Sequence, residues 1–313
     1  MRVIPVCVVL GGWLSMPALA AEAEDWMQRL AMADKQQSYA GTFVYERNGS
    51  FSSHGVWQQV DGDTVRERLL QLDGAPVEVL LVDGEVQCAS RQLSHVNQSP
   101  RLGKQAFDVK SLAQWYEFRL IGDSRVAGRP AVAIAVRPKD QHRYGFELHL
   151  DSETALPLKS LLLGDGGQLL ERFQYTGFTL DGVSAADLEP GKGCESMPVA
   201  QRSEAAEPAW HSDWLPPGFQ LLDSSVRQSP ASDESVVWLT YGDGLARFSV
   251  FLEPLRNAVV EDARSQMGPT VAVSKRATTA TGDVMVTVVG EIPLGTAERV
   301  ALSMREGQGL ARR

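Results

Sequence analysis

The sequence predicts a mainly β protein of the α+β class, with a larger antiparallel sheet domain followed by a smaller α+β domain. Residues 39–89 hold four short strand-like runs, separated by turn signals at Asn48-Gly49, Asp61-Gly62, Asp73-Gly74 and Asp83-Gly84. Asn and Asp tolerate the left-handed backbone of a tight hairpin turn, and Gly adopts it without steric cost. A turn roughly every ten to twelve residues is typical of an antiparallel meander.

A second series of strands is expected to continue this sheet. Apolar and small or polar residues alternate clearly in two of them, with Val132, Ile134 and Val136 on one face of the first, and Phe146 and Leu148 on one face of the second. The predicted strands are 118–126, 130–136, 143–150, 158–163 and 168–176. With the first series they give roughly nine strands, which should form a highly curved or partly closed sheet.

Two helices are expected to pack on one face of this sheet. Residues 22–38 place Trp26, Met27, Leu30 and Ala31 on one helical stripe, and residues 107–116 are predicted to form a short helix with Leu112 and Trp115 on one face. We expect the first helix to cover the sheet as a lid.

The composition changes after the sheet, which predicts the domain boundaries. Residues 186–208 are rich in Ala, Glu, Pro and Gly and predict a linker between a domain at 21–185 and a smaller one at 209–313. In the smaller domain we expect a hairpin about Gly242-Asp243-Gly244, a strand at 285–290, and a helix at 296–304 that Thr296 caps.

The first twenty residues predict a secretory signal. Arg2 precedes an apolar run, and Ala18-Leu19-Ala20 forms a cleavage site, so cleavage is expected after Ala20. The alternative, a membrane anchor, is disfavoured because the run is short and interrupted. Loss of Arg2 takes the formal charge from -9 to about -10, which argues against nucleic acid or an anionic membrane as partner. A soluble, exported protein is predicted.

Two cysteines remain after export. Cys88 and Cys194 are candidates for a disulfide in an oxidising compartment. Two buried free thiols are the open alternative, since unpaired buried cysteines are also common.

The familiar enzymatic motifs are missing from the sequence. The five histidines do not pair as H-E-x-x-H or approach the cysteines with zinc spacing, and there is no nucleophile elbow, phosphate loop or dinucleotide fingerprint. We therefore expect no catalytic residues, no metal and no cofactor.

A curved sheet that carries large apolar residues could instead enclose a lipid. The candidate lipid-binding residues are Phe43, Tyr45, Trp57, Phe146, Leu148 and Phe173. The alternative is that these side chains fill the core beneath the helices, and the pattern alone does not separate a filled from an empty barrel.

Several long strings closely resemble the RseB/MucB family of periplasmic regulators of an envelope-stress, alginate-controlling sigma factor. They include GTFVYERNGSF, RVAGRPAV, DQHRYGFELHLD, WLPPGF, YGDGLARFSVFLEP and VTVVGEIPLGTAERVALSM, and the resemblance runs from Asp25 to about Met304. It implies an N-terminal unclosed β-barrel with helices over its concave face, like the LolA/LolB lipoprotein carriers, and a smaller C-terminal domain.

The resemblance also implies a function. The protein is expected to bind the periplasmic domain of a membrane-spanning anti-sigma factor, to protect it from the site-1 protease, and to release it when lipopolysaccharide or acyl chains signal envelope damage. Candidate partner contacts are Tyr241, Arg247, Phe248 and Phe251. The alternative is a soluble periplasmic carrier of lipid or lipoprotein, and formation of a homo-oligomer is left open.

Overall fold

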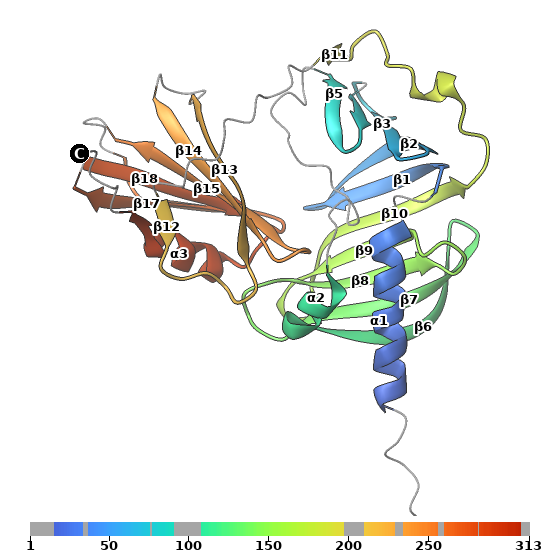
Figure 1. The fold of residues 1–313 in the computed structure, drawn as a ribbon, viewed down its shortest axis with the longest axis horizontal. Coiled ribbons are helices and arrows are strands. Elements are labelled where there is room, and N and C mark those ends of the chain that lie inside the picture. Colours follow the sequence, from blue (N-terminus) through green and yellow to red (C-terminus); the bar gives the residue numbers. More distant parts are fainter. Residues whose placement is uncertain are drawn as a thin grey trace, which may run out of the picture.

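The structure is a computed structural model that describes residues 16–33, 37–75, 77–90, 108–196, 210–228, 234–255, 260–280 and 282–307. It has two domains side by side, a larger one around an eleven-stranded sheet and a smaller one around a six-stranded sheet (Figure 1). No helix in these ranges is long and apolar enough to cross a membrane.

The large sheet joins two meanders through its first strand. Its strands are β1 (Tyr39–Arg47), β2 (Ser50–Asp61), β3 (Thr64–Gln71), β4 (Glu78–Val82), β5 (Glu85–Ala89), β6 (Tyr116–Val126), β7 (Arg129–Pro138), β8 (Gly145–Asp151), β9 (Pro157–Leu163), β10 (Leu169–Thr179) and β11 (Glu195–Ser196). Their order is β11-β5-β4-β3-β2-β1-β10-β9-β8-β7-β6, so β1 pairs with β10. The four predicted turns separate five strands, β1 to β5, and the expectation of four was wrong because four turns bound five runs.

The large sheet is curved but not closed. Strands β6 and β11 form its two edges and do not pair with each other. Helices α1 (Met16–Ala33) and α2 (Val109–Trp115) cover the β6–β9 half of one face, the concave face (Figure 1). Ala23, Met27 and Leu30 of α1 are buried there against a cluster that includes Ile134 and Leu148. The mainly β fold with an unclosed sheet is therefore confirmed.

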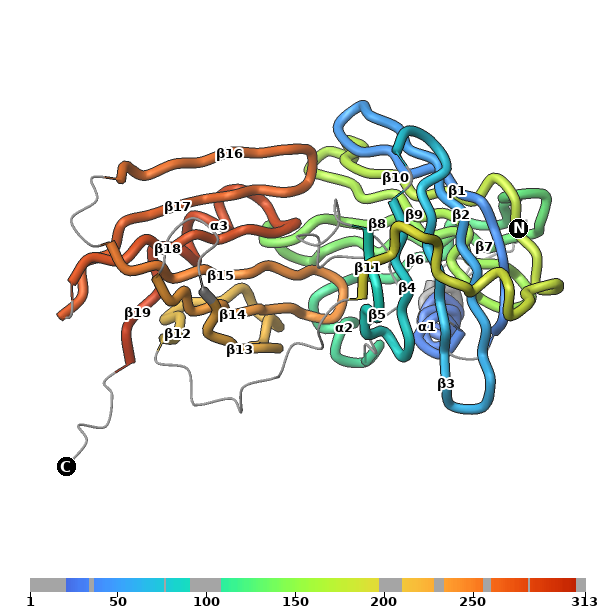
Figure 2. Tube along the Cα trace, turned by 90° about the horizontal axis from the view of Figure 1, so that it is seen from above, coloured from blue at the N-terminus to red at the C-terminus, as the bar shows by residue number. Residues whose placement is uncertain are grey.

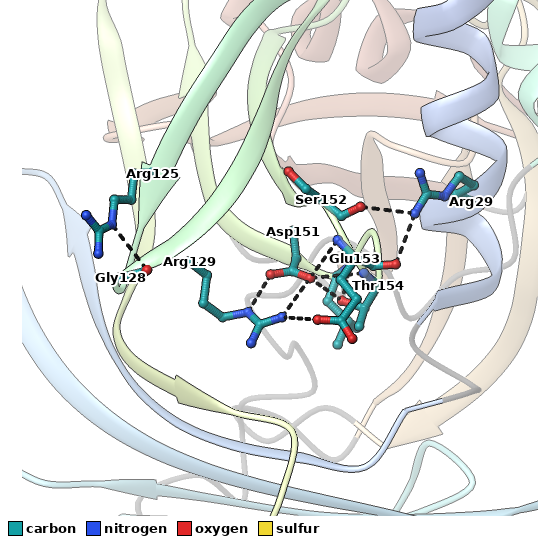
Figure 3. A network of polar contacts seen from close by, with 9 residues as sticks. Arg29, Arg125, Gly128, Arg129, Asp151, Ser152, Glu153 and Thr154 are labelled. Carbon is teal, nitrogen blue, oxygen red and sulfur yellow. Dashed lines mark hydrogen bonds and ion pairs between the residues drawn. The ribbon is translucent and has the colours of Figure 1, made fainter.

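Polar contacts fasten α1 to one end of the sheet (Figure 3). The Arg29 guanidinium donates to the carbonyl oxygens of Ser152 and Glu153, at 3.5 and 3.1 Å, in the turn between β8 and β9. The carboxylate of Asp151 holds that turn, because it accepts from the Arg129 guanidinium and from the backbone N–H of Glu153. These bonds supplement the apolar stripe that the sequence predicted.

Residues 184–196 pack against the large domain. The short helix η3 (Ala185–Leu188) lies beside β3, the Gly191 N–H donates to the Glu78 carboxylate, and Cys88 and Cys194 form a disulfide that links β5 to the chain before β11. The described part of the predicted linker thus packs on the large domain. Residues 197–209 lie outside the described ranges.

The small domain packs one helix on one face of its sheet. Its elements are β12 (Trp210–Ser212), β13 (Gln220–Gln228), β14 (Ser235–Gly242), β15 (Arg247–Pro254), β16 (Ala263–Met267), β17 (Thr270–Thr279), β18 (Gly282–Gly290), α3 (Leu294–Ser303) and β19 (Met304–Glu306). The large domain also contains the single turn η2 (Asp165–Gly167). The expected cap at Thr296 was wrong, because α3 begins two residues earlier and Thr296 is buried within it.

Candidate functional site: the interface between the two domains

A buried ion pair joins the domains. Arg143 of the large domain and Asp243 of the small domain have fully buried side chains, and Arg143 Nη1 lies 2.6 Å from Asp243 Oδ2. The Tyr116 hydroxyl donates to the same oxygen at 3.0 Å. Asp140 binds the other side of the guanidinium at 3.0 and 3.1 Å, and the carbonyl oxygen of Pro217 accepts a further bond from it. The charges are thus paired and their hydrogen bonds satisfied, as buried charges require.

The turn between β14 and β15 presents Asp243 to the large domain. The second carboxylate oxygen, Oδ1, accepts from the backbone N–H groups of Leu245 and Ala246 at 2.9 and 2.8 Å, which closes the turn. Its first oxygen is then held in position for Arg143 and Tyr116. Burial, followed by the charge of Asp243, raises the pKa of the Tyr116 hydroxyl well above its usual value, so that it remains a donor.

Aromatic and backbone groups pack closely around this pair. The Arg143 guanidinium lies 5.1 Å from the ring centroid of Phe219 and 5.3 Å from that of Tyr116. At Gly218 an added Cβ would come within 2.2 Å of the Trp115 ring, and the backbone has a φ of +85°. Only glycine allows this close approach of the WLPPGF loop to α2.

Two neighbouring contacts widen the interface. The Tyr144 hydroxyl donates to the carbonyl oxygen of Ile292 at 3.3 Å. His142 Nδ1 lies within hydrogen-bonding distance, 3.3 Å, of the Thr296 hydroxyl, and its ring packs edge-on against Trp214. Residues 142–144 therefore all contact the small domain.

A separate polar contact lies at the end of β1. Arg47 donates to the Glu291 carboxylate at 3.0 Å and to the hydroxyl of Thr270, both in the small domain. The hairpin turn between β16 and β17 approaches the same strand end, since the space beside Gly268 is bounded by Arg47 and Asn48. From above, the six-stranded sheet extends beside the large domain (Figure 2).

The structure divides the predicted lipid-binding residues between two clusters and two faces. Phe43 and Phe173 pack on each other with ring centroids 4.7 Å apart, and Tyr45 is half-buried beside them. Phe146 and Leu148 lie in the cluster beneath α1. Trp57 pairs with Ala40, so by strand alternation it points to the opposite face from Phe43 and Tyr45. The expectation that Trp57 faces inward was therefore wrong. The lipid-binding role of the other five stays a prediction.

The predicted partner contacts also fall in different environments. Tyr241 and Phe248 are 3% and 1% exposed and stack on each other in the core of the small domain, so their side chains are unavailable to a partner in this arrangement. Their large apolar surface is what that core requires. Arg247 is exposed, and Phe251 is half-buried against Trp238 on the other face of the sheet.

Sequence reasoning missed the residues that join the domains. Arg143, Asp243, Arg47 and Glu291 all lie inside strings that carry the family resemblance, but none follows a motif that marks an interface. The available signal was Asp243 in a Gly-Asp-Gly turn. Such an aspartate closes its own turn with one oxygen, and nothing in the sequence tells where the other points.

Comparisons with known proteins agree with this architecture. The chain matches the MucB/RseB N-terminal domain over residues 22–197 and the MucB/RseB C-terminal domain over residues 204–305. It is 58% identical to the sigma factor AlgU regulatory protein MucB of Pseudomonas aeruginosa, over 97% of this chain and 98% of that protein. It is 28% identical to the sigma-E factor regulatory protein RseB of Escherichia coli, over 90% of each.

Solved structures of MucB share the fold. A crystal structure of MucB in complex with MucA(peri) gives a TM-score of 0.81 at 58% identity, over 92% of this chain and 100% of that one. A crystal structure of MucB gives 0.70 at 57% identity, over 91% and 98%. Both domain matches, the full-length identity and the shared fold place this chain in the MucB/RseB family.

Proposed function

We propose that this protein is a regulatory binding protein for a membrane-spanning anti-sigma factor. It binds the periplasmic part of that factor, protects it from the site-1 protease and so represses an envelope-stress sigma factor. The observation that carries the proposal is the full-length, 58% identical relative that is named as a sigma factor regulator and whose fold was solved with MucA(peri).

The arrangement of the two domains supports this function. The chain superposes on two structures of MucB with MucA at TM-scores of 0.81 and 0.82, and on MucB described without a partner at 0.70, although identity and coverage are nearly the same. The arrangement held by Arg143 and Asp243 is thus nearer to the structures that contain the partner. A partner segment that contacts both domains would be bound or released according to their orientation.

Lipid is proposed as the releasing signal, with the concave face of the large domain as its site. Each methylene buried there would contribute about 0.8 kcal/mol, so a few carbons could shift the balance between two domain arrangements. The packed rings of Phe43 and Phe173 would have to separate to admit an acyl chain.

Export and a non-catalytic role complete the proposal. The predicted signal sequence, with cleavage after Ala20, supports a periplasmic location for the mature protein. We propose that it acts there by binding and not by catalysis, so that the stability of its complex with the anti-sigma factor determines the degree of repression.

Calorimetry tests the proposal. The chain from Ala21 onward is titrated with the periplasmic segment of the cognate anti-sigma factor, with and without a lipopolysaccharide fragment. Tight binding that weakens at least tenfold with lipid supports it. No binding to the segment, with lipid still retained, would instead indicate a lipid carrier.

Two variants locate the lipid site within this experiment. Phe43→Leu should reduce the lipid effect, because Phe43 lies on the concave face, while Trp57→Leu should leave it unchanged, because Trp57 lies on the other face. Equal effects of the two variants would place the lipid elsewhere.

A further inference from the structure

The contact at the end of β1 shares one arginine between two glutamates. Arg47 Nη2 lies 3.0 Å from Oε1 of Glu291, which follows β18 in the small domain. Arg47 Nε lies 3.9 Å from Oε2 of Glu171, its neighbour across the β1–β10 ladder. A single guanidinium therefore stands between a carboxylate of each domain.

The surrounding groups do not neutralise the second carboxylate. The Tyr45 hydroxyl on β1 hydrogen-bonds Glu171, and Tyr144 faces Glu291 and Asp165 of η2. Both tyrosines are neutral hydroxyls, because burial raises the pKa of each. Glu171 and Glu291 thus both depend on the charge of Arg47, with Asp165 as a further acid near Tyr144.

The next charged residues along the strands point away from this contact. Glu46 and Arg172 alternate with Arg47 and Glu171 along β1 and β10, and they pair with each other at 3.4 Å. They leave the balance of charge around Glu171 and Glu291 unchanged.

Burial makes the excess of negative charge costly. The Glu171 side chain is only 14% exposed. Burial first, and then the charge of Glu291, raises the pKa of Glu171 from 4.5 to about 7. Glu291 is 37% exposed, and burial also raises the pKa of its carboxyl. Because Glu171 is the better buried of the two, its protonation dominates the expected pH response of this contact.

We propose that Arg47, Glu171 and Glu291 form a proton-sensitive contact between the two domains, which holds them together below neutral pH and weakens above it. With one proton shared by the two carboxyls, Arg47 neutralises the remaining charge across the interface. Without that proton, two carboxylates share the charge of Arg47, and separating the domains relieves their repulsion. The inference goes beyond the proposed function, because it concerns the two domains by themselves.

The direction of the pH dependence follows from the raised pKa of Glu171. A carboxyl that binds its proton more tightly in the closed arrangement stabilises that arrangement at low pH. Burial is the largest cause of the raised pKa and the charge of Glu291 is the next, and the part that the small domain contributes stabilises the closed arrangement until the pH rises through about 7. The change therefore falls between weakly acidic and weakly basic conditions.

Small-angle X-ray scattering between pH 5.5 and 8.5 tests the proposal, on the chain from Ala21 onward with its disulfide intact. The radius of gyration should rise with pH, with a midpoint near 7. Glu171→Gln, which mimics the protonated carboxyl, should remain compact throughout. Glu46→Gln is the matched control, one residue from Arg47 but on the opposite face, and should keep the wild-type profile.

Glu291→Gln separates an interdomain effect from one confined to the large domain. It should abolish the pH profile as Glu171→Gln does, and the double variant should add nothing further, since both changes remove the same pair. Glu291→Gln also decides the question if Glu171→Gln fails to fold. A wild-type profile in Glu291→Gln, or constant scattering of the wild-type chain across the range, would overturn the proposal.

His142 is a second titratable group at the interface, and its contribution is separable. His142→Gln retains a polar side chain beside Thr296 and removes the imidazole ring. The pH profile should persist in this variant. Its loss in His142→Gln would assign the pH dependence to the histidine and overturn the proposal.

Discussion

The two charged contacts between the domains solve the same problem differently. Each contact places one arginine between two carboxylates, and the two differ in burial and hydrogen bonding. Arg143 is fully buried between Asp140 and Asp243, and Asp243 also accepts from Tyr116 and two backbone N–H groups. Arg47 is one-third exposed and faces two carboxyls. A buried pair whose hydrogen bonds are satisfied costs much to break, whereas Glu171, whose pKa is raised by burial and by Glu291, changes its charge near neutral pH. The first contact fixes the position of the domains and the second can adjust it.

The largest effect is expected where the matched pair is broken. Arg143→Ala leaves Asp243 buried without its cation, which should cost about 3–5 kcal/mol of the free energy of unfolding. Urea unfolding followed by tryptophan fluorescence measures this. Arg125→Ala, which removes an exposed arginine that donates to the Gly128 carbonyl, is the control and should change little. A loss of stability in Arg143→Ala no larger than in Arg125→Ala would show that the buried contact is not costly to break.

A single hydroxyl provides a finer test of the same pair. Tyr116→Phe deletes only the bond to Asp243 and should cost about 1.5–3 kcal/mol, because the acceptor is charged. Tyr144→Phe deletes a bond to the neutral Ile292 carbonyl and should cost about 1 kcal/mol in the same unfolding experiment. The reverse order would show that Asp243 is adequately satisfied without Tyr116.

A substitution at the Arg47 contact should change the free energy of unfolding less. Thr270→Val removes a hydroxyl that accepts from Arg47, and we expect a loss of about 0.5–1.5 kcal/mol at pH 6. The loss should be smaller at pH 8.5, where the contact is already weakened. Thermal unfolding at the two pH values measures both, and a loss independent of pH would uncouple Thr270 from the cluster.

The smallest effect is expected away from the interface. Arg29→Ala removes bonds from α1 to the β8–β9 turn and should cost about 1 kcal/mol or less, because the contact is exposed (Figure 3). Scattering of this variant should match the wild type at each pH. A changed pH profile would mean that α1 also positions the small domain.

Local signals in the sequence predicted most of the fold. The Asn-Gly and Asp-Gly turns, the alternation in residues 130–150 and the stripe of α1 depend on neighbours in the chain, and each appears in the structure as a turn, strand or helix. Face assignment was less secure. Trp57 was placed inward from its size alone, although the register of β2 against β1 turns it outward.

The interface was beyond prediction because its partners are far apart in sequence. Arg143 and Asp243 are separated by 100 residues, and Arg47 and Glu291 by 244. Charged residues at strand ends are usually solvated, so their types carry no sign of burial. Likewise, Cys88 and Cys194 were candidates for a disulfide, but only the pairing of β11 with β5 brings them together.

The sequence by itself determined the family, the mainly β class and the order of turns, because these depend on residue type and short spacing. The tertiary structure alone decided that β1 pairs with β10, that residues 184–196 pack on the large domain, and that Arg47 meets two glutamates across the interface. Each of these joins segments at long range. Their energies come from burial and charge balance, which exist only after the chain has folded.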